Sequence, residues 1–121
     1  MVTGQLEIGE DRSLLLVDDD EPFLKRLAKA MDKRGFSVEQ AGSVAAGCAI
    51  ATARPPAYAV VDLRLEDGNG LDVVETLRAK RPDSRVVVLT GYGAIATAVA
   101  AVKIGATDYL SKPADATDIT K

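Results

Sequence analysis

Acidic residues follow two of the apolar runs in this sequence. The block Asp18–Asp20 follows the run Leu14–Val17, and Asp62 follows a second run at Tyr58–Val61. Carboxylates about 5 Å apart repel by roughly 3 kcal/mol per pair at an effective dielectric near 20, so a group of them needs a cation. An all-oxygen set suits Mg²⁺, which keeps several waters and prefers phosphate as a further ligand. The sequence therefore predicts a magnesium site.

A hydroxyl and an ammonium group follow two further apolar runs. Thr90 follows Arg85–Leu89, and Lys112 comes shortly after Asp108–Leu110. Such groups beside a cation match what a transferring phosphoryl group requires, namely positioning and neutralisation of charge. A carboxylate on a buried strand end, here Asp62, can itself be the nucleophile and form an aspartyl phosphate.

Stretches of helical period separate these short runs, and a fifth run lies at Ser37–Ala41. The predicted helices lie between Pro22 and Gly35, Ser43 and Pro55, Leu71 and Pro82, and Ile95 and Gly105. Asp20 and Glu21 are both available to cap the first helix. Near-continuous apolar strands joined by helices predict an α/β fold whose parallel sheet is covered on both faces. In such sheets sites form at the carboxyl ends of the strands, where all these polar residues fall.

Composition excludes several classes of function. The chain has 121 residues, 15 Lys and Arg against 18 Asp and Glu, and no His. Its net charge of −3 gives no overall attraction to nucleic acid or an anionic membrane, and without His there is no Ser-His-Asp chemistry. With no membrane-length apolar run and no signal peptide, we expect a cytoplasmic protein. Cys48, on an apolar helix stripe, is interpreted as a small core residue, with redox sensing as the alternative.

The expected domain organisation is a tail and one domain. Residues 1–12 are polar and without period, which predicts a flexible N-terminal tail, and residues 13–121 form the domain. After the fifth strand only Ala114–Lys121 remain, about two turns of helix. We therefore expect an incomplete last helix that leaves apolar surface uncovered. This predicts lower stability, or a homodimer that covers the gap.

Four motifs, in order, resemble those of a known family. They are LLLVDDDEP, AVVDLRLEDGNGL, VVVLTGYG and DYLSKP. They resemble the acidic, acceptor, Thr and Lys-Pro motifs of response-regulator receiver domains, the phosphoacceptor modules of bacterial two-component signalling. LTGYG and IATAVAAVKIGATDYLSKPADATDI are similar to the RegA/PrrA/ActR group of global redox regulators. The resemblance implies a flavodoxin-like, doubly wound, five-stranded parallel sheet of order 2-1-3-4-5.

The resemblance also implies a role for each matching residue. Asp18 and Asp19 match the metal-binding acidic pair, and Asp62 matches the phosphoacceptor, which is also a metal ligand. Arg64 matches the residue whose backbone carbonyl binds Mg²⁺, and Thr90 and Lys112 match the residues that contact the phosphoryl group. Thr90 and Tyr109 match the switch pair, and Arg64 and Tyr92 match the positions that tune phosphoryl lifetime. One residue departs from the pattern. Glu66 stands where receivers commonly have Pro.

The implied function is control by phosphorylation. Asp62 would take a phosphoryl group from a sensor histidine kinase with Mg²⁺, and the face of the fourth helix, fifth strand and fifth helix would change to control a DNA-binding output. The chain would catalyse its own phosphotransfer and dephosphorylation without being a turnover enzyme. Regulators of this group carry a Pro-rich linker and a helix-turn-helix after the receiver. Neither is found in this sequence, so we expect an isolated receiver, cut inside its last helix, that has no DNA contact of its own.

Two alternatives stay open at this point. Asp18–Asp20 contains the D-x-D that follows the first strand of haloacid-dehalogenase-type hydrolases, in which Asp18 would form the aspartyl phosphate. Pro22 at the fifth motif position and the short chain argue against it. The other alternative is a binding module that is never phosphorylated. The intact acceptor, Thr and Lys positions argue against that.

Overall fold

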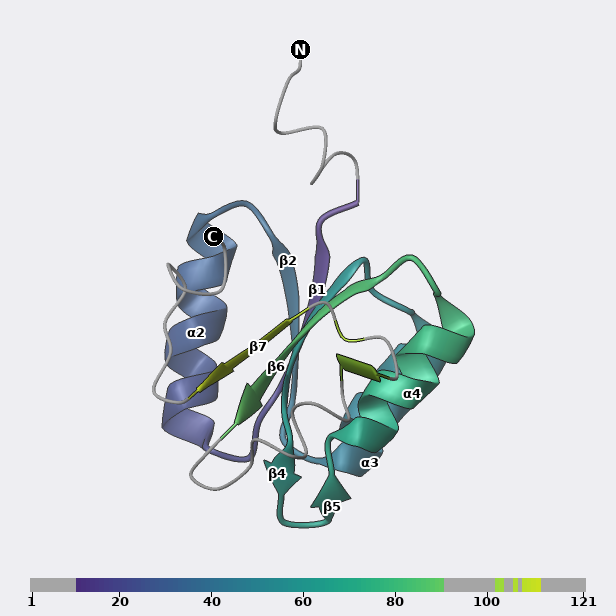
Figure 1. Ribbon diagram of the computed structural model, residues 1–121. Helices are drawn as coiled ribbons and strands as arrows, with labels where there is room; N and C mark the ends of the chain where they lie inside the picture. Colours follow the sequence, from purple (N-terminus) through teal and green to yellow (C-terminus); the bar gives the residue numbers. More distant parts are fainter. Residues whose placement is uncertain (1–10, 91–101, 104–105, 107, 112–121) are drawn as a thin grey trace.

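The computed structural model describes residues 11–90, 102–103, 106 and 108–111 (Figure 1). Its helices are α2 (Glu21–Lys33), α3 (Val44–Ala53) and α4 (Leu71–Lys80), and its main strands are β1 (Ser13–Val17), β2 (Ser37–Ala41), β3 (Tyr58–Asp62), β6 (Arg85–Thr90) and β7 (Asp108–Ser111). The five strands form one parallel sheet in the order β2-β1-β3-β6-β7. Counted along the chain this order is 2-1-3-4-5, which confirms the predicted flavodoxin-like α/β fold.

The sheet is covered on both faces. Figure 1 shows α2 on one side of it and α3 with α4 on the other. In β1, Leu14 and Leu16 belong to the apolar cluster that includes α2, whereas Leu15 and Val17 belong to the cluster on the opposite face. All four side chains are at most 2% exposed. Burying one such side chain stabilises the fold by about 1.5–3 kcal/mol, so the near-continuous apolar strand is what the two helical layers require.

The ends of the helices follow from their capping residues. Asp20 is the N-cap of α2 and its side chain accepts a hydrogen bond from the Phe23 amide. Ser43 is the N-cap of α3, and its side chain accepts a hydrogen bond from the Ala46 amide. Past the end of α2, Gly35 has a φ of 95°, a conformation that disfavours other residues and ends the helix.

Two features differ from the sequence-based expectations. The segment after β3 forms a small antiparallel hairpin, β4 (Arg64–Leu65) with β5 (Gly68–Asn69), that periodicity did not predict. Asp11, assigned to the tail, is instead held by Ser13 and Arg81. The hydrogen bonds from Ser13 are the main reason that the pKa of Asp11 falls to about 2. These contacts are polar and therefore leave no trace in hydrophobic periodicity.

Further sequence-based predictions can be compared with the structure. Cys48 is half-buried and packs against the core, which agrees with its interpretation as a small core residue. Within the described residues, no helix is long and apolar enough to cross a membrane. Residues 1–10, residues 112–121 and most of the predicted fourth helix lie outside the described part of the chain. The predicted flexibility of residues 1–10 and the predicted last helix therefore stay predictions.

Candidate metal centre

The acidic residues meet where the strand order reverses. From β1 the chain crosses to β2 on one side and then to β3 on the other, which makes the β1–β3 boundary the switch point of the sheet. Val17 pairs with Val61 across this boundary, so Asp18 and Asp62 leave neighbouring strand ends. The Asp18 amide donates to the Ala41 carbonyl, which extends the sheet ladder one residue further and fixes the Asp18 backbone.

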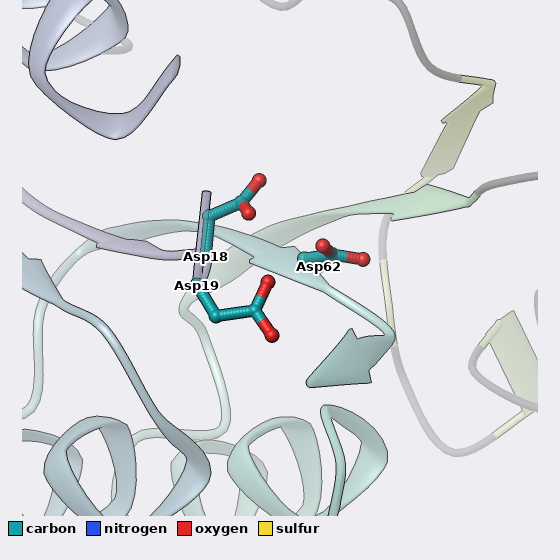
Figure 2. Close-up of side chains that lie close together, drawn as sticks. All are labelled: Asp18, Asp19 and Asp62. Carbon is teal, nitrogen blue, oxygen red and sulfur yellow. The ribbon is translucent and has the colours of Figure 1, made fainter. Parts of the chain in front are cut away.

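Three carboxylates converge at this point. One oxygen from each of Asp18, Asp19 and Asp62 lies within 4.8 Å of the others. Figure 2 shows the carboxylates of Asp18 and Asp19 directed to the side on which Asp62 lies. Asp18 is 2% exposed and Asp62 is 5% exposed, whereas Asp19 is exposed. Two buried carboxylates this close are unfavourable unless a positive charge compensates them.

The donor set fits Mg²⁺. Mg²⁺ binds oxygen at about 2.0–2.1 Å in an octahedron, which places ligand oxygens roughly 3 to 4 Å apart. One oxygen from each of the three carboxylates lies within 4.8 Å of the others, close to that range, and Asp19 is exposed, so water or phosphate can reach this side of the group. These are the three residues that the sequence predicted as metal-binding carboxylates. Asp20, the third acid of the block, is outside the group because it caps α2.

Backbone amides orient all three carboxylates. A hydrogen bond to the charged form of a carboxylate favours that form and limits its rotation. The pairs are Asp20 N to Asp18 Oδ1 at 2.9 Å, Arg64 N to Asp62 Oδ1 at 3.0 Å, and Glu66 N to Asp19 Oδ2 at 3.0 Å. Two of the three donors lie on the segment that follows β3. The conformation of that segment therefore determines where the acids point.

Two close contacts hold this segment in place. The Gly70 amide donates to the Leu63 carbonyl at 3.0 Å, which closes the hairpin before α4 begins. The carboxylate of Asp67 accepts from the amides of Val44 at 2.8 Å and Ala45 at 3.1 Å. Those are free amides at the start of α3, so Asp67 adds a second cap to that helix. The Val44 hydrogen bond is the first cause that lowers the pKa of Asp67 below its ordinary value.

The structure gives backbone positions for only some of the other predicted site residues. Thr90 ends β6 and pairs through its backbone with Ser111, the last residue of β7, so both strands end at the edge that carries the acids. Tyr109 lies in β7 opposite Val88. Lys112 and Tyr92 lie outside the described residues. Their predicted roles, and those of the Thr90 hydroxyl and the Tyr109 ring, stay predictions.

Three residues of this segment were not predicted to belong to the site. Asp67 and Gly70 had no predicted role, and Glu66 was noted only as a departure from the family pattern. The signal for Asp67 and Gly70 is an acidic, glycine-rich turn directly after the acceptor strand. That pattern predicts a turn but does not say which helix or strand the turn will contact.

Comparison with known proteins identifies the family. Residues 14–121 match the response regulator receiver domain. The chain is 79% identical over 120 residues to the photosynthetic apparatus regulatory protein RegA of Rhodovulum sulfidophilum, covering 99% of this chain and 66% of that protein. It is 67% identical over 112 residues to the acid tolerance regulatory protein ActR of Rhizobium meliloti (strain 1021), covering 93% of this chain and 58% of that protein. The chain thus spans less than two thirds of the length of these curated relatives.

A solved structure agrees with this assignment. A response regulator from Burkholderia pseudomallei, crystallised with a phosphorylated aspartic acid, a calcium ion and citrate, superposes with a TM-score of 0.85 at 42% identity. The match covers 91% of this chain and 65% of that one. The haloacid-dehalogenase alternative, with Asp18 as nucleophile, finds no support in these comparisons. The chain belongs to the response regulator receiver domain family, and its relatives include regulators of the RegA and ActR type.

Proposed function

We propose that Asp62 is the phosphoacceptor of this receiver domain and that Asp18, Asp19 and Asp62 together hold Mg²⁺ during phosphorylation. One observation carries the proposal. The three carboxylates converge within 4.8 Å at the switch point of a receiver-type sheet, and two of them are buried. Parallel α/β sheets place their ligands at this position.

The chemistry follows from the positions of these groups. An oxygen of Asp62 attacks the phosphorus of a phosphohistidine, forming an O–P bond as the P–N bond breaks and the electron pair leaves on the imidazole nitrogen. Mg²⁺ held by Asp18, Asp19 and Asp62 would supply positive charge that neutralises the carboxylates and the phosphoryl oxygens. The Arg64 amide keeps one Asp62 oxygen oriented. The Arg64 carbonyl as a further metal ligand, and the Thr90 hydroxyl and Lys112 ammonium as phosphoryl contacts, complete the proposed site.

The partners follow from the donor that this reaction requires. These 121 residues contain no His, so the phosphohistidine belongs to a sensor histidine kinase outside this sequence. Phosphorylation then shifts the population of two states through Thr90 and Tyr109, because the phosphoryl group is held better in one of them. In the full-length protein this shift controls a DNA-binding output in the cytoplasm. Loss of the phosphoryl group, tuned by Arg64 and Tyr92, is self-catalysed and resets the domain.

The test is the intact mass of the protein after incubation with Mg²⁺ and acetyl phosphate. The parent should gain one labile phosphoryl group, and Asp62→Asn should gain none. Asp72→Asn, which changes an exposed carboxylate of α4, is the matched control and should be labelled like the parent. EDTA should prevent labelling. Labelling of Asp62→Asn at the parent rate would overturn the assignment of the acceptor.

The homodimer predicted from the sequence is tested with the same preparation. Sedimentation velocity over a wide concentration range, with and without acetyl phosphate, reports the oligomeric state directly. A dimer in either state supports the prediction. A monomer in both states, at concentrations above those used for labelling, contradicts it.

A further inference from the structure

The hydrogen bond between Glu66 and Asp19 joins residues 47 positions apart. The Glu66 amide donates to Asp19 Oδ2 at 3.0 Å. Asp19 is the exposed member of the acidic group, whereas Asp18 and Asp62 are buried. Packing therefore restricts the Asp19 side chain less than it restricts the other two. For Asp19, orientation toward the group depends strongly on this hydrogen bond.

The donor is itself anchored. Glu66 lies between Leu65, in β4, and Asp67, whose carboxylate accepts from the first two amides of α3. The anchor at Asp67 fixes the hairpin against the start of α3, and the hairpin places the Glu66 amide over Asp19. A continuous set of contacts thus connects the N-terminus of α3 to the metal centre.

The bond also depends on the residue type at position 66. Proline has no amide hydrogen and cannot donate. Glu66, which stands where the family commonly has Pro, supplies a donor that a proline would remove. The hydrogen bond to Asp19 uses the backbone N–H of Glu66 and not its carboxylate.

We propose that Glu66 is a positioning residue for the metal centre. Its backbone amide holds the exposed Asp19 carboxylate toward Asp18 and Asp62, and Asp67 holds Glu66 in place. This inference rests on the proposed function, because it assigns Mg²⁺ binding to the same three carboxylates. Glu66 does not contact the ion through its side chain in this proposal. It acts through Asp19.

A pair of variants isolates the amide. Glu66→Ala and Glu66→Pro both lose the carboxylate, but only Glu66→Pro loses the N–H. Leu65 is already extended, the conformation that a following proline requires. Titration calorimetry with MgCl₂ should give an affinity for Glu66→Pro that is roughly threefold to tenfold weaker than for Glu66→Ala. The unfolding temperatures of the two in EDTA should agree. Equal Mg²⁺ affinities in two folded variants would overturn the proposal.

A second measurement needs neither proline nor metal. Hydrogen exchange of the Glu66 amide, followed by NMR in EDTA, should be roughly threefold or more faster in Asp19→Ala than in the parent. The Arg64 amide, which donates to Asp62, is the internal control and should exchange at the same rate in both. Equal Glu66 exchange in both proteins would overturn the positioning role. A parent that binds no Mg²⁺ and takes up no phosphoryl group would instead overturn the proposed function, and the exchange test would still report on the hydrogen bond.

Discussion

Gly70 lies directly against the main-chain carbonyl of Asp62. A Cβ atom on Gly70 would stand 2.2 Å from that oxygen and 2.8 Å from Cγ1 of Val61, both closer than real Cβ atoms approach. The φ of Gly70 is −58°, an ordinary helical value, so the position requires glycine for space and not for conformational freedom. The turn into α4 thus passes over the end of the strand that carries the acceptor.

Gly70→Ala should therefore damage both stability and phosphorylation. Its methyl group would have to displace main-chain atoms of Asp62, which lie in a hydrogen-bonded strand and cannot rotate away. Overpacking of this kind costs about 1–3 kcal/mol. We expect that loss in the free energy of unfolding in urea, together with slower labelling by acetyl phosphate because the Asp62 backbone shifts.

Gly42→Ala is the matched control. A Cβ at Gly42 would meet no atom within 4 Å. Its free energy of unfolding should stay within about 0.5 kcal/mol of the parent, or rise slightly because alanine restricts the unfolded chain. Equal stabilities of Gly70→Ala and Gly42→Ala would show that the close contact with Asp62 does not exist in solution.

Asp62→Asn should change the free energy of unfolding in opposite directions with and without Mg²⁺. In EDTA, three carboxylates within 4.8 Å repel one another, and replacing one charge relieves up to about 3 kcal/mol per pair. Asn keeps an oxygen that can accept from the Arg64 amide, so this hydrogen bond is retained. In EDTA the variant should therefore unfold at higher urea concentration than the parent.

With Mg²⁺ the order should reverse. An ion that binds only the folded parent stabilises it by about 2.7 kcal/mol at a hundredfold excess over Kd, and the variant loses one of the three acidic ligands. Urea unfolding of both proteins, in EDTA and in MgCl₂, gives the four values needed. A variant less stable than the parent in EDTA would mean that charge repulsion does not dominate the metal-free site.

The contribution of Asp67 should disappear in acid. Its two hydrogen bonds with α3 lower its folded-state pKa below the unfolded value of about 3.9. A group with a lowered folded-state pKa contributes its full stability above the unfolded pKa and loses it as the pH falls through the folded pKa. Asp67→Ala should therefore lower the unfolding temperature at pH 7 and have progressively less effect below about pH 4.

Asp32→Ala controls for a general effect of charge. Asp32 is an exposed carboxylate of α2 whose side chain makes no hydrogen bond with any described residue. Its difference from the parent should stay small across the same pH range. An Asp67→Ala difference that is equally large at pH 7 and in acid would show that the side chain acts through packing and not through its charge.

The central strands β1, β3 and β6 could be predicted because each is a near-continuous apolar run. β1 and β3 are buried on both faces, as the strands of a doubly covered parallel sheet are, and their neighbouring ends bring Asp18 and Asp62 together. The hairpin could not be predicted, because two residues per strand are too few to show a period. The role of the Glu66 amide as a donor to Asp19 could not be predicted either, since every residue except proline carries the same backbone donor.

The roles of Asp11 and Gly70 could not be predicted from the sequence for a different reason. Asp11 is held by polar contacts with Ser13 and with Arg81, which lies 70 positions further along the chain, so nothing local distinguishes it from a tail residue. The requirement for glycine at Gly70 arises from a tertiary contact with the end of β3. In both cases the determining neighbour is known only once the sheet has assembled.

Within the acidic block Asp18–Asp20, Asp20 caps α2, whereas Asp18 and Asp19 belong to the proposed metal centre. The sequence left Asp20 and Glu21 open as the cap of α2, and the structure shows that Asp20 accepts from the Phe23 amide at 3.2 Å. Loss of an N-cap typically costs about 1 kcal/mol. Asp20→Ala should lower the free energy of unfolding by that amount and leave the Mg²⁺ affinity within about twofold, because the group that donates to Asp18 Oδ1 is the backbone amide of Asp20, which the variant keeps.

Asp20→Asn distinguishes the cap from the charge. Asparagine caps helices about as well as aspartate, so this variant should keep most of the stability that Asp20→Ala loses. Urea unfolding and titration with MgCl₂ on the parent and both variants complete the test. A large loss of Mg²⁺ affinity in both would place Asp20 in the metal centre, since both remove its charge and only one removes the cap.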